Sequence, residues 1–225
     1  MELSLGLAAW KSQGGNRWAL RCNPSSGNLH PTEGYLVCPA LPGIEAGVLH
    51  YQSHDHCLEQ RLAIDDSAWN RILDGQVLVA LSSIAWREAW KYGARAYRYC
   101  PLDAGHALAA LRYAAAALGW QARLLTGHSD SSIAALLGLD REQDFAGAET
   151  ESPELLLAVG PAPTDCELRE LLAAARSGQW LGRANRLSDE HREWPQIPAV
   201  EAACRKPETP PVACWRPAEL APQRP

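Results

Sequence analysis

The sequence lacks the features that mark membrane-spanning, secreted or nucleic-acid-binding proteins. Residues 1–12 are apolar for only about ten positions and carry neither a basic leader nor a small-residue cleavage site, so neither a membrane span nor a signal peptide fits. The net charge of -5 and the pI near 5.8 give no general attraction to a phosphate backbone. We therefore expect a cytoplasmic protein that binds neither membranes nor nucleic acid.

Paired cysteines and the common signatures of nucleotide and hydrolase sites are also missing. The seven cysteines are scattered singly, with no C-x-x-C pair and an odd total, which is typical of free thiols in a reducing cytosol. There is no G-x-x-x-x-G-K-[ST] phosphate loop, no G-x-G-x-x-G opening and no G-x-S-x-G elbow. These absences argue against a disulfide framework, a P-loop enzyme and a serine hydrolase.

The composition indicates one folded domain followed by a different segment. The chain has 225 residues, of which 47% are hydrophobic and 21% are charged, as in globular proteins with a substantial core. Eight of the sixteen prolines lie between Pro195 and Pro225, where no hydrophobic periodicity is visible. We therefore predict a domain over residues 1–194 and an irregular or surface-wrapped tail over residues 195–225.

Strand and helix patterns interleave along the domain. Short apolar runs predict strands at residues 35–38, 48–51, 57–62, 77–81, 121–125 and 155–159. Helices are predicted over residues 3–11, 67–73, 82–93, 103–119, 130–137 and 165–176, with Ser82 and Ser83 capping the third and Asp103 the fourth. Residues 17–34 are predicted to form a structured loop. This order favours an α/β or α+β fold.

That loop is the first candidate for a binding site. Its hydroxyl, amide and backbone N–H groups lie close together in the chain, and two arginines just upstream are candidate phosphate partners. Glycine would let the backbone approach a ligand closely. The alternative is a solvated surface turn with two unpaired arginines. The residues concerned are Arg17, Arg21, Ser25, Ser26, Gly27 and Asn28.

Four strings, in chain order, resemble one known family. They are RCNPSSGNLHPTEGYLV, then KYGARAYRY followed by LDAGHALAALRYAAAALGW, and finally NRLSDEHREWP. They are similar to the nitroreductase-like, FMN-dependent flavoproteins, and most of all to the branch of SagB-type dehydrogenases, the oxidases of thiazole- and oxazole-forming peptide synthetases. Several ordered motifs in one chain are more specific than any single motif.

The resemblance implies an α+β fold with a central, mainly antiparallel sheet flanked by helices. It also implies a homodimer with FMN at the subunit interface and hydride transfer between the flavin and a small-molecule or peptide substrate of the azoline type. NAD(P)H is a candidate electron donor. The residues placed at the flavin are Arg17, Arg21, Ser25, Ser26, Gly27, Asn28 and His30.

Lys91 and Tyr92 are the candidate catalytic residues. They resemble a Lys-Tyr pair associated with catalysis in the peptide-oxidase branch, where a lysine can act as a base and a phenol can relay a proton. The alternative is a helix end at which Lys91 complements the helix dipole and Tyr92 packs. Arg95 and Arg98 are candidates to meet the flavin phosphate or a peptide carboxylate.

The remaining histidines are not expected to form a metal site. His50, His54 and His56 lie near Cys57, but no second pair of ligands has useful spacing, so the polar tip of a hairpin is the simpler interpretation. His106 lies within the alanine-rich helix and is expected to be a core histidine.

Two further functions stay open. Relatives generally carry basic residues ahead of the position of Leu3 that help to anchor the FMN phosphate, and this sequence has almost none of that segment. This favours, as the alternative to an enzyme, a non-catalytic partner or scaffold subunit that binds a peptide or a flavin. A protein that binds flavin without turnover, for sequestration, is the third hypothesis.

Overall fold

A seven-stranded antiparallel sheet forms the centre of the protein. The computed structural model describes residues 1–190 and 192–212. The strands run in the order β7-β8-β6-β3-β4-β5-β9, and every pairing is antiparallel. Their bounds are β3 (Thr32–Cys38), β4 (Gly47–Gln52), β5 (Cys57–Ala63), β6 (Val77–Ser83), β7 (Gln121–Leu124), β8 (Ser152–Gly160) and β9 (Gln179–Trp180). The predicted α+β class with a mainly antiparallel sheet is confirmed.

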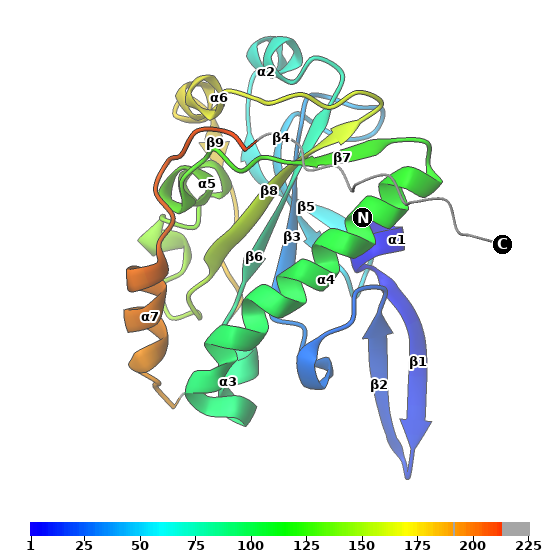
Figure 1. Ribbon diagram of the computed structural model, residues 1–225, viewed down its shortest axis with the longest axis vertical. Helices are drawn as coiled ribbons and strands as arrows, with labels where there is room; N and C mark the ends of the chain where they lie inside the picture. Colours follow the sequence, from blue (N-terminus) through cyan, green and yellow to red (C-terminus); the bar gives the residue numbers. More distant parts are fainter. Residues whose placement is uncertain (191, 213–225) are drawn as a thin grey trace, which may run out of the picture.

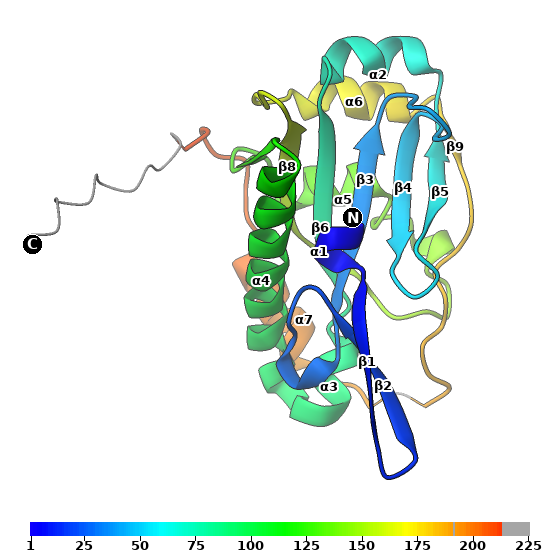
Figure 2. The same cartoon turned by 90° about the vertical axis from the view of Figure 1, so that its right-hand side faces the viewer.

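Helices cover both faces of this sheet. They are α1 (Glu2–Leu5), α2 (Asp66–Leu73), α3 (Trp86–Tyr92), α4 (Ala96–Ala117), α5 (Asp130–Leu137), α6 (Leu168–Ala175) and α7 (Gln196–Cys204). Figure 1 shows α4 crossing in front of the sheet, and Figure 2 shows α2 and α6 at the end opposite α3. In the described part of the chain, no helix is both long and apolar enough to cross a membrane.

The central strand β3 packs against both layers, because successive side chains of a strand point to opposite faces. Tyr35 and Val37 join a core cluster with residues of α2, α5 and α6, whereas Leu36 and Cys38 join a second cluster with residues of α1 and α4. All seven residues of β3 are buried. The sheet is therefore covered on both faces around β3, and the ends of its central strands are where loops reach the surface.

The N-terminal region differs from its prediction. The expected helix over residues 3–11 is wrong: α1 ends at Leu5, and β1 (Leu7–Gln13) pairs with β2 (Asn16–Arg21) as a two-stranded ribbon that projects from the body (Figures 1 and 2). Part of the expected loop is thus a strand. The turn between them, Gly14 and Gly15, has positive φ at both positions, which glycine adopts without strain, so these residues close a hairpin rather than end a helix.

Helix α4 also starts earlier than predicted. It begins at Ala96, seven positions before the expected cap at Asp103, which instead lies inside the helix and is buried. Pro101 does not stop the helix: it is the sixth residue of α4, and the helix continues through it to Ala117. Ser82 and Ser83 are likewise not caps: they end β6, and α3 starts after Ala85.

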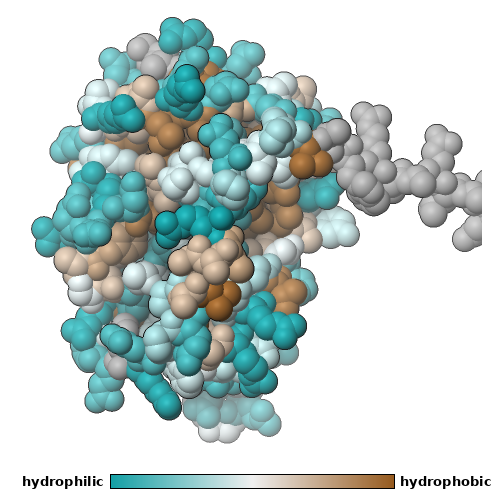
Figure 3. All heavy atoms as spheres, turned by 60° about the vertical axis from the view of Figure 1, so that its left-hand side comes forward, coloured by the Kyte–Doolittle hydropathy of each residue, from teal (hydrophilic) through white to brown (hydrophobic). Residues whose placement is uncertain are grey.

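The proline-rich segment contains regular structure. Helix α7 spans residues that were expected to be irregular, and its Ile197 packs with Ala89 of α3 and Ala96 of α4. Residues 206–212 follow it and bond to residues 126–130, for example from Thr209 N to Gly127 O at 2.9 Å. Residues 213–225 lie outside the described part, and the boundary at residue 194 stays a prediction. Figure 3 shows this side of the molecule, where hydrophobic patches are interspersed with a mostly hydrophilic surface.

Candidate functional site

The loop between β2 and β3 has an unusual backbone. Gly27, Asn28 and His30 have φ values of 62°, 61° and 52°, in the left-handed region. Glycine adopts this region freely and asparagine more readily than most residues, so the sequence G-N suits the short 3-10 turn Ser26–Asn28. The turn exposes Gly27 and leaves its neighbours partly exposed.

Asp103 holds this loop against α4. Its carboxylate accepts hydrogen bonds from Ser25 Oγ at 2.6 Å, from Ser26 Oγ at 2.9 Å and from Ser26 N at 3.0 Å. Ser25 Oγ in turn accepts from the N–H of His30 at 2.8 Å. The two hydroxyls predicted to bind a flavin therefore shape the loop in this structure, and Asp103, interpreted from sequence as a helix cap, is the residue that anchors them.

Asn28 and His30 are also tied within the loop. Asn28 Nδ2 donates to Ala19 O at 2.9 Å, which turns Oδ1 towards His30 Nε2, also at 2.9 Å. Because Oδ1 can only accept, this geometry assigns the proton of the neutral His30 ring to Nε2. Burial and the charge of Arg21 lower the pKa of His30 to about 4, so the ring is neutral at physiological pH.

Lys91 and Tyr92 converge on the same loop from the end of α3. A Cβ atom added to Gly27 would lie 2.6 Å from Tyr92 Oη and 2.9 Å from Lys91 Nζ. Tyr92 packs against Tyr99 of α4, with ring centroids 4.6 Å apart, whereas Lys91 is exposed. The structure thus brings the predicted cofactor loop and the predicted catalytic pair together, although more than sixty residues separate them in the chain.

The two arginines lie elsewhere. Arg21 points inward, and its Nη1 donates to Thr32 O at 3.2 Å. Burial lowers the pKa of its guanidinium, and the nearby charge of Glu33 acts in the opposite direction. Arg17 lies on the projecting hairpin, exposed, with its guanidinium 4.2 Å from the ring centroid of Trp10. Neither arginine is placed beside Gly27 in this structure.

Sequence reasoning missed Glu88, a carboxyl group beneath the site. Glu88 is fully buried on α3, and neither of its oxygens has a hydrogen-bond partner among the described residues. Burial, with the neighbouring charge of Asp103, raises the pKa of Glu88 to about 7, while Lys91 acts in the opposite direction. The only signal in the sequence is a glutamate one turn before Lys91 in a largely apolar helix.

A second missed feature is a chain of charged side chains behind the loop. Arg87 Nη1 donates to His30 O at 2.9 Å and forms an ion pair with Glu33. His50 lies between two glutamates. Its Nε2 is 2.7 Å from a carboxylate oxygen of Glu33, and its Nδ1 is 2.8 Å from a carboxylate oxygen of Glu59. Burial raises the pKa of Glu33, but the charges of Arg87 and His50 outweigh this and lower it to about 2. Burial lowers the pKa of His50, but its bonds to Glu33 and Glu59 raise it to about 9.

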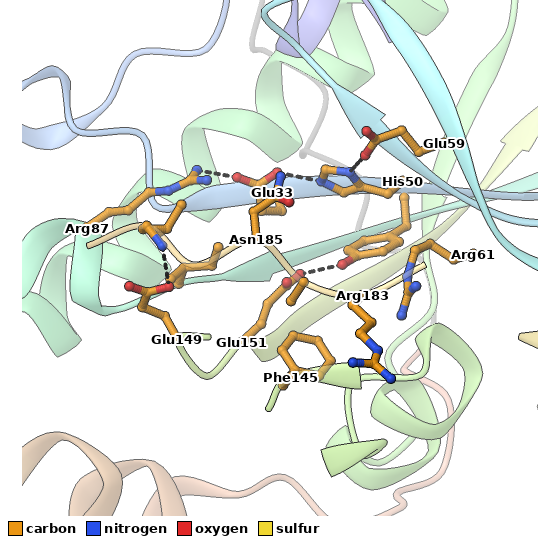
Figure 4. Close-up of a pocket in the computed structure, with 14 residues that line it drawn as sticks. Glu33, His50, Glu59, Arg61, Arg87, Phe145, Glu149, Glu151, Arg183 and Asn185 are labelled. Carbon is orange, nitrogen blue, oxygen red and sulfur yellow. Dashed lines mark hydrogen bonds and ion pairs between the residues drawn. The ribbon is translucent and has the colours of Figure 1, made fainter. Parts of the chain in front are cut away.

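This chain borders a polar cavity of 120 Å³, shown in Figure 4. The cavity lies between side chains of β3, β4 and β5 and the segment of residues 183–187. Carboxylates and arginines dominate its wall, with one phenylalanine and one tyrosine among them. Its lining includes Glu33, Tyr35, His50, Glu59, Arg61, Arg87, Phe145, Glu149, Glu151, Arg183 and Asn185.

The two histidines at the tip of the β4–β5 hairpin have partners within that hairpin. His54 pairs with Asp55 at 2.7 Å, and His56 contacts Tyr51 at 2.8 Å. Residues 1–190 and 192–212 contain no group of three or more metal-binding side chains. The expectation that His106 is a core histidine is wrong: it lies on the exposed face of α4, because that helix packs through Ala107 and Leu111 instead.

Comparison with known proteins identifies the fold. The family model of the nitroreductase family matches residues 16–160, which is more than half of the chain. The chain belongs to the nitroreductase family. Members of this family are generally flavin-dependent oxidoreductases that bind FMN, and the observed sheet and helices match the fold that the sequence motifs implied.

Solved structures share this fold at low sequence identity. A protein from Anabaena variabilis, provisionally described as a nitroreductase, superimposes with a TM-score of 0.63 and 23% identity over 92% of this chain and 42% of its own length. The E. coli microcin synthetase McbBCD complex, with truncated pro-MccB17 bound, gives a TM-score of 0.54 and 22% identity over 72% and 62% of the respective chains. This chain therefore spans about two fifths of the length of the first of these chains and three fifths of the length of the second. No curated protein matches.

Proposed function

We propose that this nitroreductase-family chain is an FMN-dependent oxidoreductase that acts on a small-molecule or azoline-type peptide substrate. The observation that carries the proposal is the convergence of Lys91 Nζ and Tyr92 Oη on Gly27, in the loop whose sequence first suggested a flavin. FMN, when bound, would supply hydride transfer, whereas the protein supplies position, charge and proton transfer.

The loop fits a polar ligand in two respects. Gly27 has no side chain of its own, and its exposed backbone lies beside two potential hydrogen-bonding groups, the hydroxyl of Tyr92 and the amine of Lys91. In addition, buried polar atoms of three nearby side chains lack partners among the described residues: both amide atoms of Asn23, His30 Nδ1 and Thr32 Oγ1. Buried polar groups are nearly always hydrogen-bonded, so a loop with several orphans is typical of a site that a ligand or water completes.

The residues of the site divide by role in this proposal. Gly27 and Asn28 hold the flavin directly, whereas Ser25 and Ser26 act through Asp103 by shaping the loop. The neutral ring of His30 fixes Asn28. Arg21 supports the start of β3.

Proton transfer is assigned to the pair on α3. Lys91 is exposed and forms no ion pair with any described residue, so its amine can approach a substrate. We propose that Lys91 takes the proton that the substrate loses, and that Tyr92 relays it. In an azoline ring, loss of this proton together with a hydride yields the aromatic azole.

Homodimerisation completes the proposal. Large apolar side chains are exposed on the projecting hairpin, at Trp10 and Trp18, and on α4, at Leu102 and Tyr113. Burial of such surfaces in a second copy would stabilise the pair. Arg17, on the same hairpin, is placed to act across that interface on the flavin phosphate.

Titration of the purified protein with FMN tests the cofactor. We expect a yellow protein, with absorbance in the flavin bands and quenching of flavin fluorescence at one equivalent per chain. A colourless protein that takes up no added FMN would contradict the proposal.

The variant Lys91→Ala tests the catalytic role. We expect FMN to stay bound while turnover of an azoline-type substrate falls by about a hundredfold, the usual contribution of a general base. Lys11→Ala, an exposed lysine on β1, is the matched control and should keep its turnover. Loss of FMN in Lys91→Ala would make Lys91 a cofactor ligand rather than a base.

One observation favours a second function. The side chains of Ser25, Ser26 and Asn28 already have partners within the protein, which would suit a subunit that keeps the fold without turnover. A protein that binds a peptide but no FMN would support this non-catalytic partner role, and a yellow protein inert towards NADH, NADPH and substrates would support sequestration.

A further inference from the structure

The polar cavity behind the loop of residues 21–33 contains a carboxylate, Glu151, that forms no ion pair with any described residue. Glu33 faces Arg87 and His50, Glu59 faces His50, and Glu149 accepts the N–H groups of residues 187 and 188 at 2.8 and 3.1 Å. Glu151 differs from them. Both of its recorded hydrogen bonds come from neutral hydroxyls and reach the same oxygen, Oε1.

Those two donors are Tyr35, at 2.7 Å, and Ser82. Figure 4 shows the hydrogen bond that the carboxylate of Glu151 accepts at the wall of the cavity. Within the described residues, no lysine, arginine or histidine forms an ion pair with Glu151. Glu151 is half-buried, and a partly desolvated carboxylate without an ion-pair partner is complementary to a cationic group that enters the cavity.

Arg183 offers the opposite charge at the same cavity. It lies on the segment of residues 183–187, is exposed, and forms no ion pair with any described residue. Arg61 and Arg87 are already engaged, with Asp144 and Glu33 respectively. The wall therefore offers a carboxylate and a guanidinium that form no ion pair with any described residue, with Phe145 and Leu187 as apolar surface.

The segment that closes the cavity is held in place. Ala184 N donates to Asp144 O at 2.8 Å, and Leu181 N donates to Arg61 O at 2.9 Å. At its other end, Glu149 accepts the two N–H groups described above. A cavity formed in this way is organised before a ligand arrives, which lowers the entropic cost of binding.

We propose that this cavity is a second binding site, separate from the flavin loop, for a small zwitterion such as a free aliphatic amino acid. The ammonium group binds Glu151, the carboxylate binds Arg183, and the aliphatic side chain lies against Phe145. The volume of 120 Å³ accommodates a molecule of about ten non-hydrogen atoms. Burial and the charge of Glu33 raise the pKa of Glu151, so binding strengthens as the pH rises and the carboxyl ionises.

Calorimetric titration of the full chain at pH 8 tests this site with four matched probes. L-leucine carries both charges, 3-methylbutylamine only the ammonium, 4-methylpentanoate only the carboxylate, and N-acetyl-L-leucine a neutral amide in place of the ammonium. We expect L-leucine to bind most tightly, the amine more weakly, and the two probes without an ammonium not at all. Absence of L-leucine binding, or equal binding of 4-methylpentanoate, would overturn the proposal.

Two variants separate the charges. Glu151→Gln keeps the shape and the acceptor for Tyr35, and it should weaken L-leucine about ten- to a hundredfold, as expected for the loss of a charge-assisted hydrogen bond. Arg183→Ala should weaken L-leucine but leave 3-methylbutylamine unchanged. The controls Glu142→Gln and Arg169→Ala, both exposed, should bind like the wild type. Unchanged L-leucine binding in Glu151→Gln, with circular dichroism confirming the fold, would refute the assignment whether or not the protein binds FMN.

Discussion

The two polar regions at this edge of the sheet differ in how their polar groups are paired. Around Gly27, several buried polar atoms lack hydrogen-bond partners among the described residues, and the exposed amine of Lys91 forms no ion pair with any of them. Around Glu33, near the start of β3, side chains of opposite charge form ion pairs with one another. This difference supports the proposal that a ligand binds at the loop, whereas the Glu33 region pairs its own charges and stabilises the loop through Arg87.

The two regions are also linked. Arg87 bonds to both Glu33 and the carbonyl oxygen of His30, so the compensated region braces the incomplete one. Four variants test this link between the two regions, beginning with the one that has the largest expected effect.

Removal of Arg87 should have the largest effect on stability. Arg87→Ala leaves buried Glu33 with His50 as its remaining ion-pair partner and Arg21 at longer range, and we expect the free energy of unfolding to fall by about 3 kcal/mol, as for other broken buried ion pairs. FMN affinity should fall with it, because His30 loses its brace. Urea denaturation measures the first effect. The double variant Arg87→Ala, Glu33→Gln should recover part of the loss, and no recovery would show that Arg87 acts independently of Glu33.

His50 should make stability depend on pH in the alkaline range. Its pKa in the folded protein, about 9, lies above the unfolded value of 6.5. Its contribution is therefore fully present below pH 6.5 and lost as the pH rises through 9. We expect His50→Gln to be less stable than the wild type by about 2 kcal/mol at pH 6, with the gap closing by pH 10.

The control for His50 is His54→Gln, at an exposed histidine of the same hairpin. It should change stability little at any pH. A constant difference between wild type and His50→Gln across the pH range would argue that His50 contributes packing rather than charge.

Glu88 should also make stability fall as the pH rises, but in a lower pH range and because its ionised form is the unfavourable one. Its folded pKa of about 7 lies above the unfolded value of 4.5, so the folded state holds the proton more tightly and stability falls as the pH rises from 4.5 through 7. We expect Glu88→Gln to match the wild type at pH 4.5 and to exceed it by about 2 kcal/mol at pH 8. Thermal melts at both pH values measure this, and a destabilised variant at pH 8 would reveal a partner for the ionised carboxylate.

Substitution of Gly27 should have the smallest effect on stability but a specific effect on the site. We expect Gly27→Ala to lower the free energy of unfolding by about 1 kcal/mol, because alanine adopts the left-handed region less readily than glycine. The added Cβ would also crowd Lys91 and Tyr92. Gly14→Ala has a similar φ of +56° with no atom within 4 Å of the added Cβ, so it isolates the backbone cost. FMN affinity should fall in Gly27→Ala and not in Gly14→Ala. Equal affinities would remove Gly27 from the cofactor site.

Local patterns account for most of the elements that could be predicted. The hairpin of β4 and β5, the buried strand β6, and helices α2 and α5 follow from hydrophobic periodicity and turn residues that lie within a few positions of one another. The errors at residues 3–11 and at the start of α4 arose where local signals were ambiguous. A short apolar run suits a helix or a strand, and only its pairing with β2 decided between them.

The site could be predicted only in part, for a related reason. The flavin loop and the Lys-Tyr pair were found because each is a contiguous motif that resembles a family. Asp103, Glu88 and the Glu33 network were missed because each depends on residues far apart in the chain. Glu33 and Arg87, for example, are 54 positions apart.

The sequence by itself determined the fold class and the family motifs, and it led to the proposal that the loop of residues 21–33 binds a flavin, because these depend on composition, periodicity and contiguous strings. Only the tertiary structure decided how that loop is used: its serines bond to Asp103, its glycine faces Lys91 and Tyr92, and Arg87 ties it to the cavity at Glu151. The physical reason is that hydrogen bonds and buried charges depend on distance in space, and the antiparallel pairing of β3, β4 and β6 sets those distances.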